Sequence, residues 1–256
     1  MKTIRVEDLS VAYRGKIALQ QVSLQLSAGK LTGIVGPNGA GKSTLMKGIL
    51  QLIKTQSGRI FYGEEPLSKQ RQKIAYVEQR QDIDLSFPID VFGVVLFGTY
   101  PRLKMFQRPG KKEKAFALEC LEKVGLTKFA DRQISELSGG QLQRVFIARA
   151  LAQQAEWILL DEPFAGIDAT SEKIIIELLK KLRDEGKSIV IVHHDLHKVT
   201  DYFDEVILLN KGLIAAGPVD QTYTTKNMEK TYGDEITQML KIGGADFATD
   251  FFSRIN

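Results

Sequence analysis

Short apolar runs alternate with amphipathic stretches along much of the chain. Residues 157–160 and 188–192 are continuous apolar runs, which are typical of parallel strands covered on both faces, and 31–35 has the same character. Between the first two, residues 171–182 place apolar side chains at helical spacing: Ile174, Ile175, Leu178, Leu179 and Leu182. Strand, helix and strand of this length predict a βαβ unit and therefore an α/β core.

The remaining stretches predict different elements. Residues 1–30 and 57–63 have the pattern of antiparallel strands, and 206–216 predicts a hairpin that turns at residues 210–212. Residues 80–150 are mostly helical in pattern, with prolines interrupting the first part. We expect one domain over 1–220 with this helical subdomain inserted at about 80–150. A C-terminal helix near 228–241 and a loose tail would complete the segment 221–256.

Charge and cysteine content narrow the classes of protein. The longest stretch without Asp, Glu, Lys or Arg has 13 residues, 17–29, whereas a membrane-spanning helix needs about 20 apolar residues. We therefore expect a chain that does not cross a bilayer alone. Charges within the first eight residues argue against a signal peptide, and the one cysteine, Cys120, fits a reducing cytoplasm.

The basic residues are unevenly distributed. The net charge of +4 fits an anionic ligand or a membrane surface and is too small to indicate nucleic acid. Between Arg102 and Lys114 there are six basic residues and one acidic residue. This stretch is either a solvated loop and helix start or a face turned toward lipid headgroups or a membrane partner.

A glycine-rich segment carries the clearest chemistry. Residues 36–43, GPNGAGKS, match the pattern G-x-x-x-x-G-K-[ST], and they follow an apolar strand and open a helix. Glycines let backbone N–H groups turn inward onto phosphate oxygens, and the helix N-terminus adds a partial positive charge. Lys42 is expected to reach the β- and γ-phosphates, and the Ser43 hydroxyl to coordinate Mg²⁺.

A pair of carboxylates follows the buried run at 157–160. Asp161 can hold Mg²⁺ through water, and Glu162 can polarise an attacking water as a general base. The alternative is that both carboxylates cap the next helix. Together with the glycine-rich segment, they favour a nucleotide-hydrolysing site.

The segment LSGGQLQR at residues 137–144 lies between these two motifs. With it, the chain resembles the nucleotide-binding subunits of ABC transporters from about residue 4 to 218. The resemblance implies a P-loop NTPase core of mainly parallel strands, with an antiparallel β subdomain and an inserted helical subdomain. It also implies ATP and Mg²⁺ as ligands. Taken alone, Ser138 is equally well explained as a helix N-cap.

The resemblance assigns roles residue by residue. Tyr13 would stack on adenine, Gln79 would touch Mg²⁺ and link to the helical subdomain, and Asp168 would cross a dimer interface. The ATP-binding set is Tyr13, Gly36, Pro37, Asn38, Gly39, Ala40, Gly41, Lys42, Ser43 and Thr44, and the Mg²⁺ set is Ser43, Gln79 and Asp161. The signature Ser138, Gly139, Gly140 and Gln141 would complete the ATP site of a second copy. Glu78 stands where the family more often has proline.

All three histidines lie within five residues: His193, His194 and His197. A metal site is one interpretation, but neighbouring side chains on a strand point to opposite faces, so His193 and His194 converge on one ion with difficulty. The resemblance makes His194 the switch histidine that contacts the γ-phosphate, so the implied catalytic set is Glu162, His194 and Gln79.

The resemblance extends to partners and cargo. A single ATPase set without a spanning helix resembles a split importer, with a second copy of this chain, membrane permease subunits and, indirectly, an extracytoplasmic metal-binding protein. We expect no nucleic acid partner and a peripheral place on the cytoplasmic face of the membrane. The segments 83–89, 161–168 and 192–196 resemble the manganese, zinc and iron importers. ATPases of iron-siderophore or cobalamin importers are the alternative, followed by non-transport ABC ATPases and interaction modules.

The apolar segment 87–101 is the expected docking face for a permease helix. Its aromatic and aliphatic side chains are otherwise explained as core of the helical subdomain.

Overall fold

The computed structural model describes residues 2–79, 85, 87–104 and 106–233. The chain forms two compact units, residues 1–70 with 190–256 and residues 71–189. The predicted boundaries at 80–150 and 220 remain a prediction. The end of the predicted helix at 228–241, part of the segment 83–89 and the tail fall on residues outside the described ranges.

An antiparallel sheet forms the N-terminal part of the first unit, as the sequence predicts. Its strand order is β2-β1-β4-β5. The strands are β1 (Ile4–Tyr13), β2 (Lys16–Leu26), β4 (Ser57–Tyr62) and β5 (Glu65–Pro66). The buried positions of β1 change phase at Asp8, which has a φ of 50° beside a register shift between Val6 and Leu9. Such a bulge keeps apolar side chains facing inward on both sides of the shift.

A second sheet contributes the rest of the strands of the first unit. β3 (Leu31–Val35) pairs in parallel with β9 (Glu205–Asn210), which forms a hairpin with β10 (Gly212–Pro218). The turn at Lys211, with a φ of 57°, confirms the predicted hairpin. The helices are α1 (Lys42–Ile49), α6 (Val199–Tyr202), α7 (Val219–Thr222) and α8 (Thr225–Tyr232). Helix α8 begins three residues before the predicted start because Thr224 caps it by accepting from the Asn227 amide.

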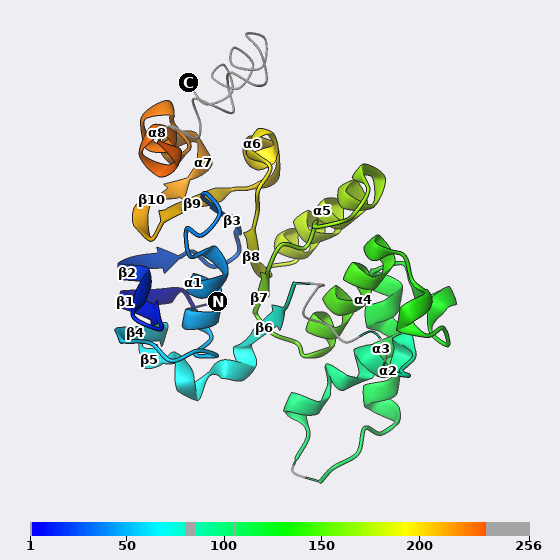
Figure 1. The fold of residues 1–256 in the computed structure, drawn as a ribbon. Coiled ribbons are helices and arrows are strands. Elements are labelled where there is room, and N and C mark those ends of the chain that lie inside the picture. Colours follow the sequence, from blue (N-terminus) through cyan, green and yellow to red (C-terminus); the bar gives the residue numbers. More distant parts are fainter. Residues whose placement is uncertain (1, 80–84, 86, 105, 234–256) are drawn as a thin grey trace. The chain divides into compact units, whose positions relative to one another are not determined.

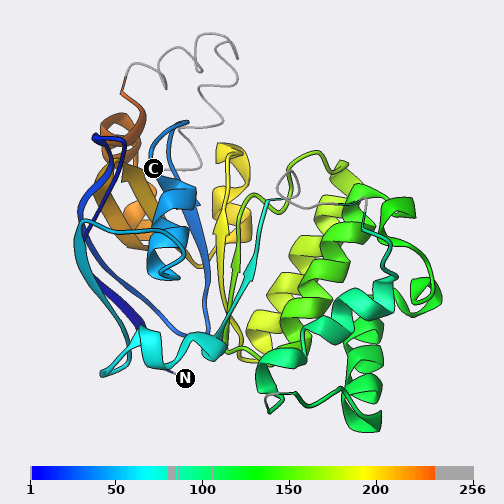
Figure 2. The ribbon, with the colours of Figure 1, turned by 60° about the horizontal axis from the view of Figure 1, so that its bottom comes forward.

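The second unit combines parallel strands with helices. β6 (Ile74–Val77) pairs in parallel with β7 (Trp157–Leu160), in the register Val77 to Leu160. The helices are α2 (Val91–Phe97), α3 (Lys111–Lys123), α4 (Gly139–Ala152) and α5 (Ala169–Asp184). Both views show α4 and α5 running side by side (Figures 1 and 2). The predominantly helical character predicted for 80–150 is confirmed by α2, α3 and α4.

The predicted apolar face of α5 is wrong at one position. The helix extends beyond 171–182 at both ends, and it buries Ile175, Ile176, Leu179 and Leu182. Ile174, expected on this face, is 44% exposed. Three consecutive isoleucines fit the periodicity in either phase, so the sequence pattern does not decide which of Ile174 and Ile176 is buried.

β8 (Ser188–Val192) is divided between the units, with residues 188–189 in the second and 190–192 in the first. All five of its residues are buried, as expected for a strand covered on both faces. Within the first unit, the His193 amide continues the pairing by donating to the Ile34 carbonyl over 3.0 Å.

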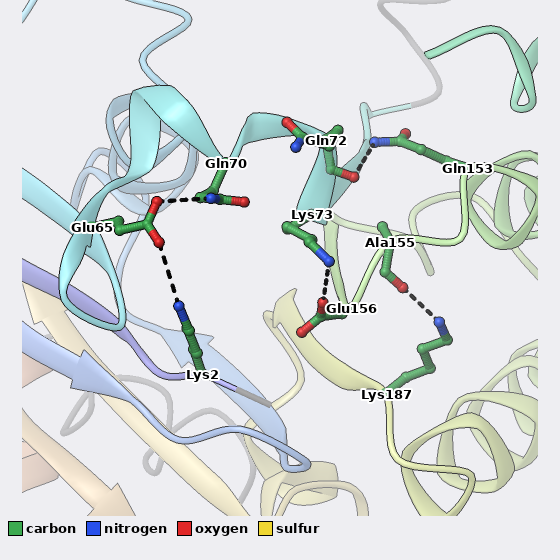
Figure 3. A network of polar contacts seen from close by, with 9 residues as sticks. All are labelled: Lys2, Glu65, Gln70, Gln72, Lys73, Gln153, Ala155, Glu156 and Lys187. Carbon is green, nitrogen blue, oxygen red and sulfur yellow. Dashed lines mark hydrogen bonds and ion pairs between the residues drawn. The ribbon is translucent and has the colours of Figure 1, made fainter. Parts of the chain in front are cut away.

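Polar contacts secure the edges of each unit (Figure 3). In the second unit, Lys73 and Glu156 form an ion pair at 2.7 Å, and the Lys187 amine donates to the Ala155 carbonyl over 2.6 Å. In the first unit, Glu65 accepts from Gln70 over 2.9 Å and pairs with Lys2 at 3.6 Å. These contacts lie apart from the residues with predicted chemistry, so we assign them to the stability of the units.

Candidate functional site

The glycine-rich loop between β3 and α1 closely approaches the neighbouring strand. A Cβ atom added at Gly36 would lie 2.0 Å from the Leu209 carbonyl oxygen of β9, so only glycine fits. The loop turns through a hydrogen bond from the Ala40 amide to the Pro37 carbonyl, at 3.1 Å. The Lys211 amide then donates to Ala40 O over 2.8 Å. The predicted cradle is therefore a loop anchored to the β9–β10 turn.

Lys42 folds back across this loop. Its side chain is 6% exposed, and its ammonium donates to the carbonyls of Gly36 at 2.7 Å and Pro37 at 2.9 Å. An ammonium has three donors and acts as a compact positive charge. The loop therefore holds its one cation inside its own curve, where a phosphate group would be bound.

The start of α1 is open in a specific way. Its N-cap is Gly41, with a φ of 94°, and no side chain caps the helix. A Cβ at Gly41 would meet the Ala18 carbonyl oxygen at 2.7 Å, so this position needs glycine for both space and conformation. The first N–H groups of a helix have no intrahelical acceptor, which makes this end suited to an anion.

The second unit brings the predicted carboxylates to the end of β7. Asp161 and Glu162 follow the last residue of β7, and Gln79 lies two residues beyond the end of β6. Because the carboxyl ends of parallel strands meet at one edge of a sheet, these side chains come together. The Gln79 amide donates to Glu162 Oε2 over 2.8 Å. The structure thus unites three of the predicted residues within one unit.

The backbone of Glu162 is held in an uncommon conformation. Its φ of 49° is in the left-handed region, which residues other than glycine rarely adopt. Such conformations persist where the surroundings enforce them, and they are concentrated at functional sites. Here the turn aims the Glu162 carboxylate at Gln79 rather than along the strand.

Sequence reasoning missed the role of Tyr76. The Tyr76 hydroxyl donates to Asp161 Oδ2 over 3.1 Å, and Asp161 is 3% exposed. A buried carboxylate needs such a donor to remain charged at low cost. The sequence does show a tyrosine near the end of an apolar strand. That its hydroxyl binds Asp161 depends on the register between β6 and β7, which the sequence does not give.

The signature segment opens α4 with a complete capping box. The backbone N–H of Gln141 donates to Ser138 Oγ over 3.3 Å, and the backbone N–H of Ser138 donates to Gln141 Oε1 over 3.0 Å. The N-cap interpretation of Ser138 is therefore confirmed. A Cβ at Gly140 would lie 2.5 Å from Ser171 Cβ, so this glycine allows close contact with the start of α5.

Asp168 caps α5 directly beside that contact. Its carboxylate accepts from the Ser171 amide over 2.9 Å. Hydrogen bonds from the side chain and backbone of Ser171 hold the pKa of Asp168 below its ordinary value. The signature glycine and the predicted interface aspartate therefore meet around Ser171 within one unit.

The histidine segment separates into a buried and an exposed residue. His193 is 4% exposed, and its ring packs against Tyr202 and Phe203 at centroid distances of 5.7 and 5.4 Å. His194 is exposed. Since His193 pairs with Ile34, His194 lies at the same edge of the sheet as the loop that begins at Gly36. The histidine predicted to contact phosphate is thus the accessible one.

The backbone after His194 is fixed by groups that sequence reasoning did not identify. Asp195 accepts from the His197 amide over 3.1 Å and pairs with Lys198 at 3.1 Å. Tyr223, which is 2% exposed, donates its hydroxyl to the Leu196 carbonyl over 2.9 Å. Burial raises the pKa of the Tyr223 phenol well above its ordinary value, so the phenol remains a donor.

Tyr13 stands at the end of β1, before a turn at Arg14 and Gly15 that has positive φ at both positions. This turn is of the kind that joins two-residue hairpins. The Tyr13 side chain is 48% exposed, so its ring is available to a planar group.

This chain belongs to the ABC transporter family. The family model with that description matches residues 19–165, more than half of the chain. The match includes the cradle, both carboxylates and the signature segment. The chain is therefore an ATP-binding ATPase of this family, with the fold that the resemblance implied.

Two curated relatives are similar over nearly their whole length. The manganese transport system ATP-binding protein MntB of Listeria monocytogenes is 61% identical over 90% of this chain and 96% of its own. The zinc transport system ATP-binding protein TroB of Treponema pallidum is 49% identical over 93% and 89%.

Solved structures show the same fold. A transporter described as of the metal-chelate type, in an inward-facing conformation, is similar with a TM-score of 0.80 and 29% identity. The match covers 90% of this chain and 88% of that one. A dimeric bacterial ABC transporter cassette, MJ0796, has a TM-score of 0.73 and 30% identity over 84% and 98%.

Proposed function

We propose that this chain is the ATP-binding and hydrolysing subunit of a multi-subunit importer for a divalent metal ion. Manganese is the first candidate, and zinc or iron the next. The observation that carries the cargo assignment is the 61% identity to a manganese transport ATP-binding protein over nearly all of both chains. The 49% identity to a zinc transport protein supports the wider class. The cargo passes through other subunits, so no residue of this chain selects it.

The loop formed by residues 36–43 would bind the triphosphate of ATP. Its support is the enclosed Lys42 ammonium and the open start of α1, which both favour anionic oxygens. Thr44 follows within the first turn of α1. Tyr13 would stack on adenine, since its ring is exposed at the end of a strand.

The residues present fit a magnesium ion chemically. Ser43, Asp161 and Gln79 offer hydroxyl, carboxylate and amide oxygens, which are the donors Mg²⁺ prefers. With its NH₂ group directed at Glu162, Gln79 has its carbonyl oxygen left to face a metal. When bound, the ion would neutralise charge on the phosphate oxygens.

Glu162 would accept the proton of the water that attacks the γ-phosphate. The Gln79 hydrogen bond and the left-handed backbone fix the position of its carboxylate. His194, which is exposed at the edge of the sheet, would contact the γ-phosphate and hold that water. Both roles come from the family resemblance, and the arrangement within each unit supports them.

A second copy would complete the site. Ser138, Gly139, Gly140 and Gln141 would engage the ATP held by the partner copy, and Asp168 would cross the interface. The capping box supports this assignment because Ser138 Oγ only accepts a hydrogen bond from the backbone N–H of Gln141. Its hydroxyl proton is therefore left to donate to a ligand. The dimeric state of the similar MJ0796 cassette gives further support.

The membrane subunits would dock on the second unit around α2. Phe87, Phe97 and Tyr100 are 58%, 51% and 46% exposed, and the rings of Phe97 and Tyr100 contact each other edge to face at a centroid distance of 5.5 Å. Exposed apolar patches of this kind mark surfaces that bind a partner. Among the described residues, no helix is long and apolar enough to span a bilayer. We propose that the chain binds at the cytoplasmic face through permeases that also receive metal from an extracytoplasmic binding protein.

The decisive experiment replaces Glu162 with Gln, which preserves shape and removes the base. ATP turnover is expected to fall about 10²–10⁴-fold while MgATP binding persists and traps a dimer. Glu177→Gln, on the exposed face of α5, is the matched control and should behave like the parent. Unchanged turnover in Glu162→Gln would remove the residue from this role.

The cargo is tested by uptake of radiolabelled manganese, zinc and iron in cells that lack this chain. Manganese uptake should fail and return with the parent chain but not with Glu162→Gln. Loss of siderophore or cobalamin uptake instead would favour the alternative importer class.

A further inference from the structure

The positive charge of this protein is concentrated in one connection. Residues 102–114, which link the 3₁₀ turn after α2 to the first turn of α3, hold six basic residues and one acidic residue. The whole chain has 35 basic and 31 acidic residues, so the rest has 29 and 30, a net charge of −1. Figure 1 shows this connection as a long green loop beside α2 and α3.

The basic side chains of this connection are displayed rather than paired. All six are exposed: Arg102, Lys104, Arg108, Lys111, Lys112 and Lys114. Within the described part of the chain, none of them takes part in an ion pair shorter than 4.0 Å. Charges without a protein partner are available to an external anion.

The one acidic residue has a structural use. Glu113 Oε2 accepts from the Gly110 amide over 2.8 Å at the start of α3. That hydrogen bond holds the pKa of Glu113 below its ordinary value. Its charge therefore serves the helix start, and the outer face of the connection stays cationic.

An exposed aromatic ring stands among these cations. Phe106 is 97% exposed, more than any other large apolar side chain described. Its φ of 67° is in the left-handed region, which is uncommon for a bulky residue. Cations beside an exposed aromatic side chain are the composition of segments that lie in the boundary of a bilayer.

A cavity lies next to these basic residues, and a small anion bound in it is one candidate ligand. The charges around the cavity favour an extended anionic surface over a small anion. The cavity, of about 370 Å³, is lined by Arg102 and Lys112 but also by Glu113 and Glu119. These charges balance, so the cavity itself attracts no anion. The surplus lies outside it, on Lys104, Arg108, Lys111 and Lys114.

We propose that Arg102, Lys104, Phe106, Arg108, Lys111, Lys112 and Lys114, the basic patch, bind the anionic lipid headgroups of a membrane surface. The cations would contact phosphate groups, and the Phe106 ring would enter the boundary between headgroups and acyl chains. This contact is separate from the permease docking and from the ATPase activity proposed above. It would orient the second unit on the bilayer before any permease is bound.

The test uses the purified full chain and sedimentation with vesicles of neutral phosphatidylcholine or of phosphatidylcholine with anionic phosphatidylglycerol. Binding is expected only to the anionic vesicles, and it should be lost in 0.5 M salt because screening shortens the reach of charges to about 4 Å. Replacing Lys111, Lys112 and Lys114 with Gln keeps good helix formers in α3. At about fivefold per charge, this variant should bind about a hundredfold more weakly.

The matched control replaces Lys30, Lys54 and Lys226, three exposed lysines elsewhere in the chain, with Gln. It changes the net charge equally and should bind vesicles like the parent. Phe106→Ser should weaken binding while leaving the salt dependence intact.

Three results would overturn the proposal. One is an equal loss of binding in the control triple variant. Another is that the basic patch binds a DNA oligonucleotide more tightly than it binds anionic vesicles. The third is recruitment only to vesicles that contain the permease. ATP turnover measured on the same samples separates a failure of this proposal from a failure of the ATPase assignment.

Discussion

Two helix starts in this protein carry glycine-rich motifs but are finished differently. Helix α1 begins after Gly41 with no capping side chain, whereas α4 begins with a reciprocal capping box between Ser138 and Gln141. The difference follows from what each end is expected to hold. In the proposed function, the α1 start binds phosphate within its own chain, and a capping side chain at this position would compete with that ligand.

In the proposed dimer, the α4 start would engage a ligand held by the second copy, so it has to be stable in the single copy without that ligand. Its capping box satisfies the first turn without any ligand. Of the two glycines that follow, Gly139 adds no side chain to the start of the helix, and Gly140 is buried against Ser171 of α5. We infer that α1 depends on its ligand for completion and that α4 does not.

The largest expected effect is at α1 and tests this dependence on ligand. Lys42→Ala removes the one cation enclosed by the loop together with two hydrogen bonds to loop carbonyls. ATP turnover should fall by at least about 10²–10³-fold, in the range found when a single charge-stabilising donor is lost. Fluorescent-nucleotide binding and phosphate release measure this. Lys47→Ala, in the last turn of the same helix, serves as control. Undiminished MgATP binding by Lys42→Ala would contradict the phosphate assignment.

The next effect separates two reasons for glycine in the same loop: lack of space for a Cβ atom and a positive φ angle. Gly36→Ala places a Cβ against the Leu209 carbonyl, so we expect about 1–3 kcal/mol of destabilisation or more, with loss of nucleotide binding. Gly39→Ala meets no neighbouring atom and has only its φ of 77° to accommodate, at about 1–2 kcal/mol. Urea unfolding with and without MgATP measures both. Equal losses would show that the contact with β9 does not position the loop.

A smaller effect is expected at α4. Ser138→Ala removes the cap and should lower the free energy of unfolding by about 0.5–2 kcal/mol. Ser138→Asp restores a capping acceptor and should recover stability, yet its negative charge should repel the phosphate of the partner copy. Thermal unfolding and ATP-dependent dimerisation separate the two roles. Full dimerisation of the Asp variant would show that Ser138 acts only as a cap.

The sequence predicts the cradle better than the contacts around it. Phosphate binding demands glycines and a lysine at fixed spacing within one loop, so residues 36–43 are recognisable without tertiary information. The Tyr76–Asp161 and Tyr223–Leu196 hydrogen bonds join segments distant in sequence. They depend on strand register and on the path of α7, which local patterns do not encode.

The fold shows the same limit at single residues. The predicted strands and the β9–β10 hairpin form because runs of apolar residues and a turn signal agree locally. In α5, by contrast, Ile174, Ile175 and Ile176 fit two faces equally well, and packing decides between them. The capping role of Ser138 follows from residue type and is found in the structure. The cap that Asp168 provides to α5 is a second role, which the sequence analysis did not assign to it.

The smallest effect compares a charged cap with a neutral one. Asp168 caps α5 as a carboxylate whose pKa lies below its ordinary value because Ser171 donates to it. A depressed folded-state pKa stabilises the folded chain above the unfolded value of about 3.9, and this contribution is lost as the pH falls through the folded value. Asp168→Asn keeps an acceptor without the charge. Its stability difference from the parent, measured by urea unfolding, should therefore shrink from pH 6 to pH 3.

The matching measurement on Ser138→Ala gives the contrast. The hydroxyl does not titrate, so its stability difference should stay constant over the same range, while the other carboxylates affect parent and variant alike. A constant difference for Asp168→Asn as well would mean that its charge contributes nothing to the start of α5. The three helix starts would then differ only in geometry: α1 left open for a ligand, and α4 and α5 each closed by a hydrogen bond from their own first turn.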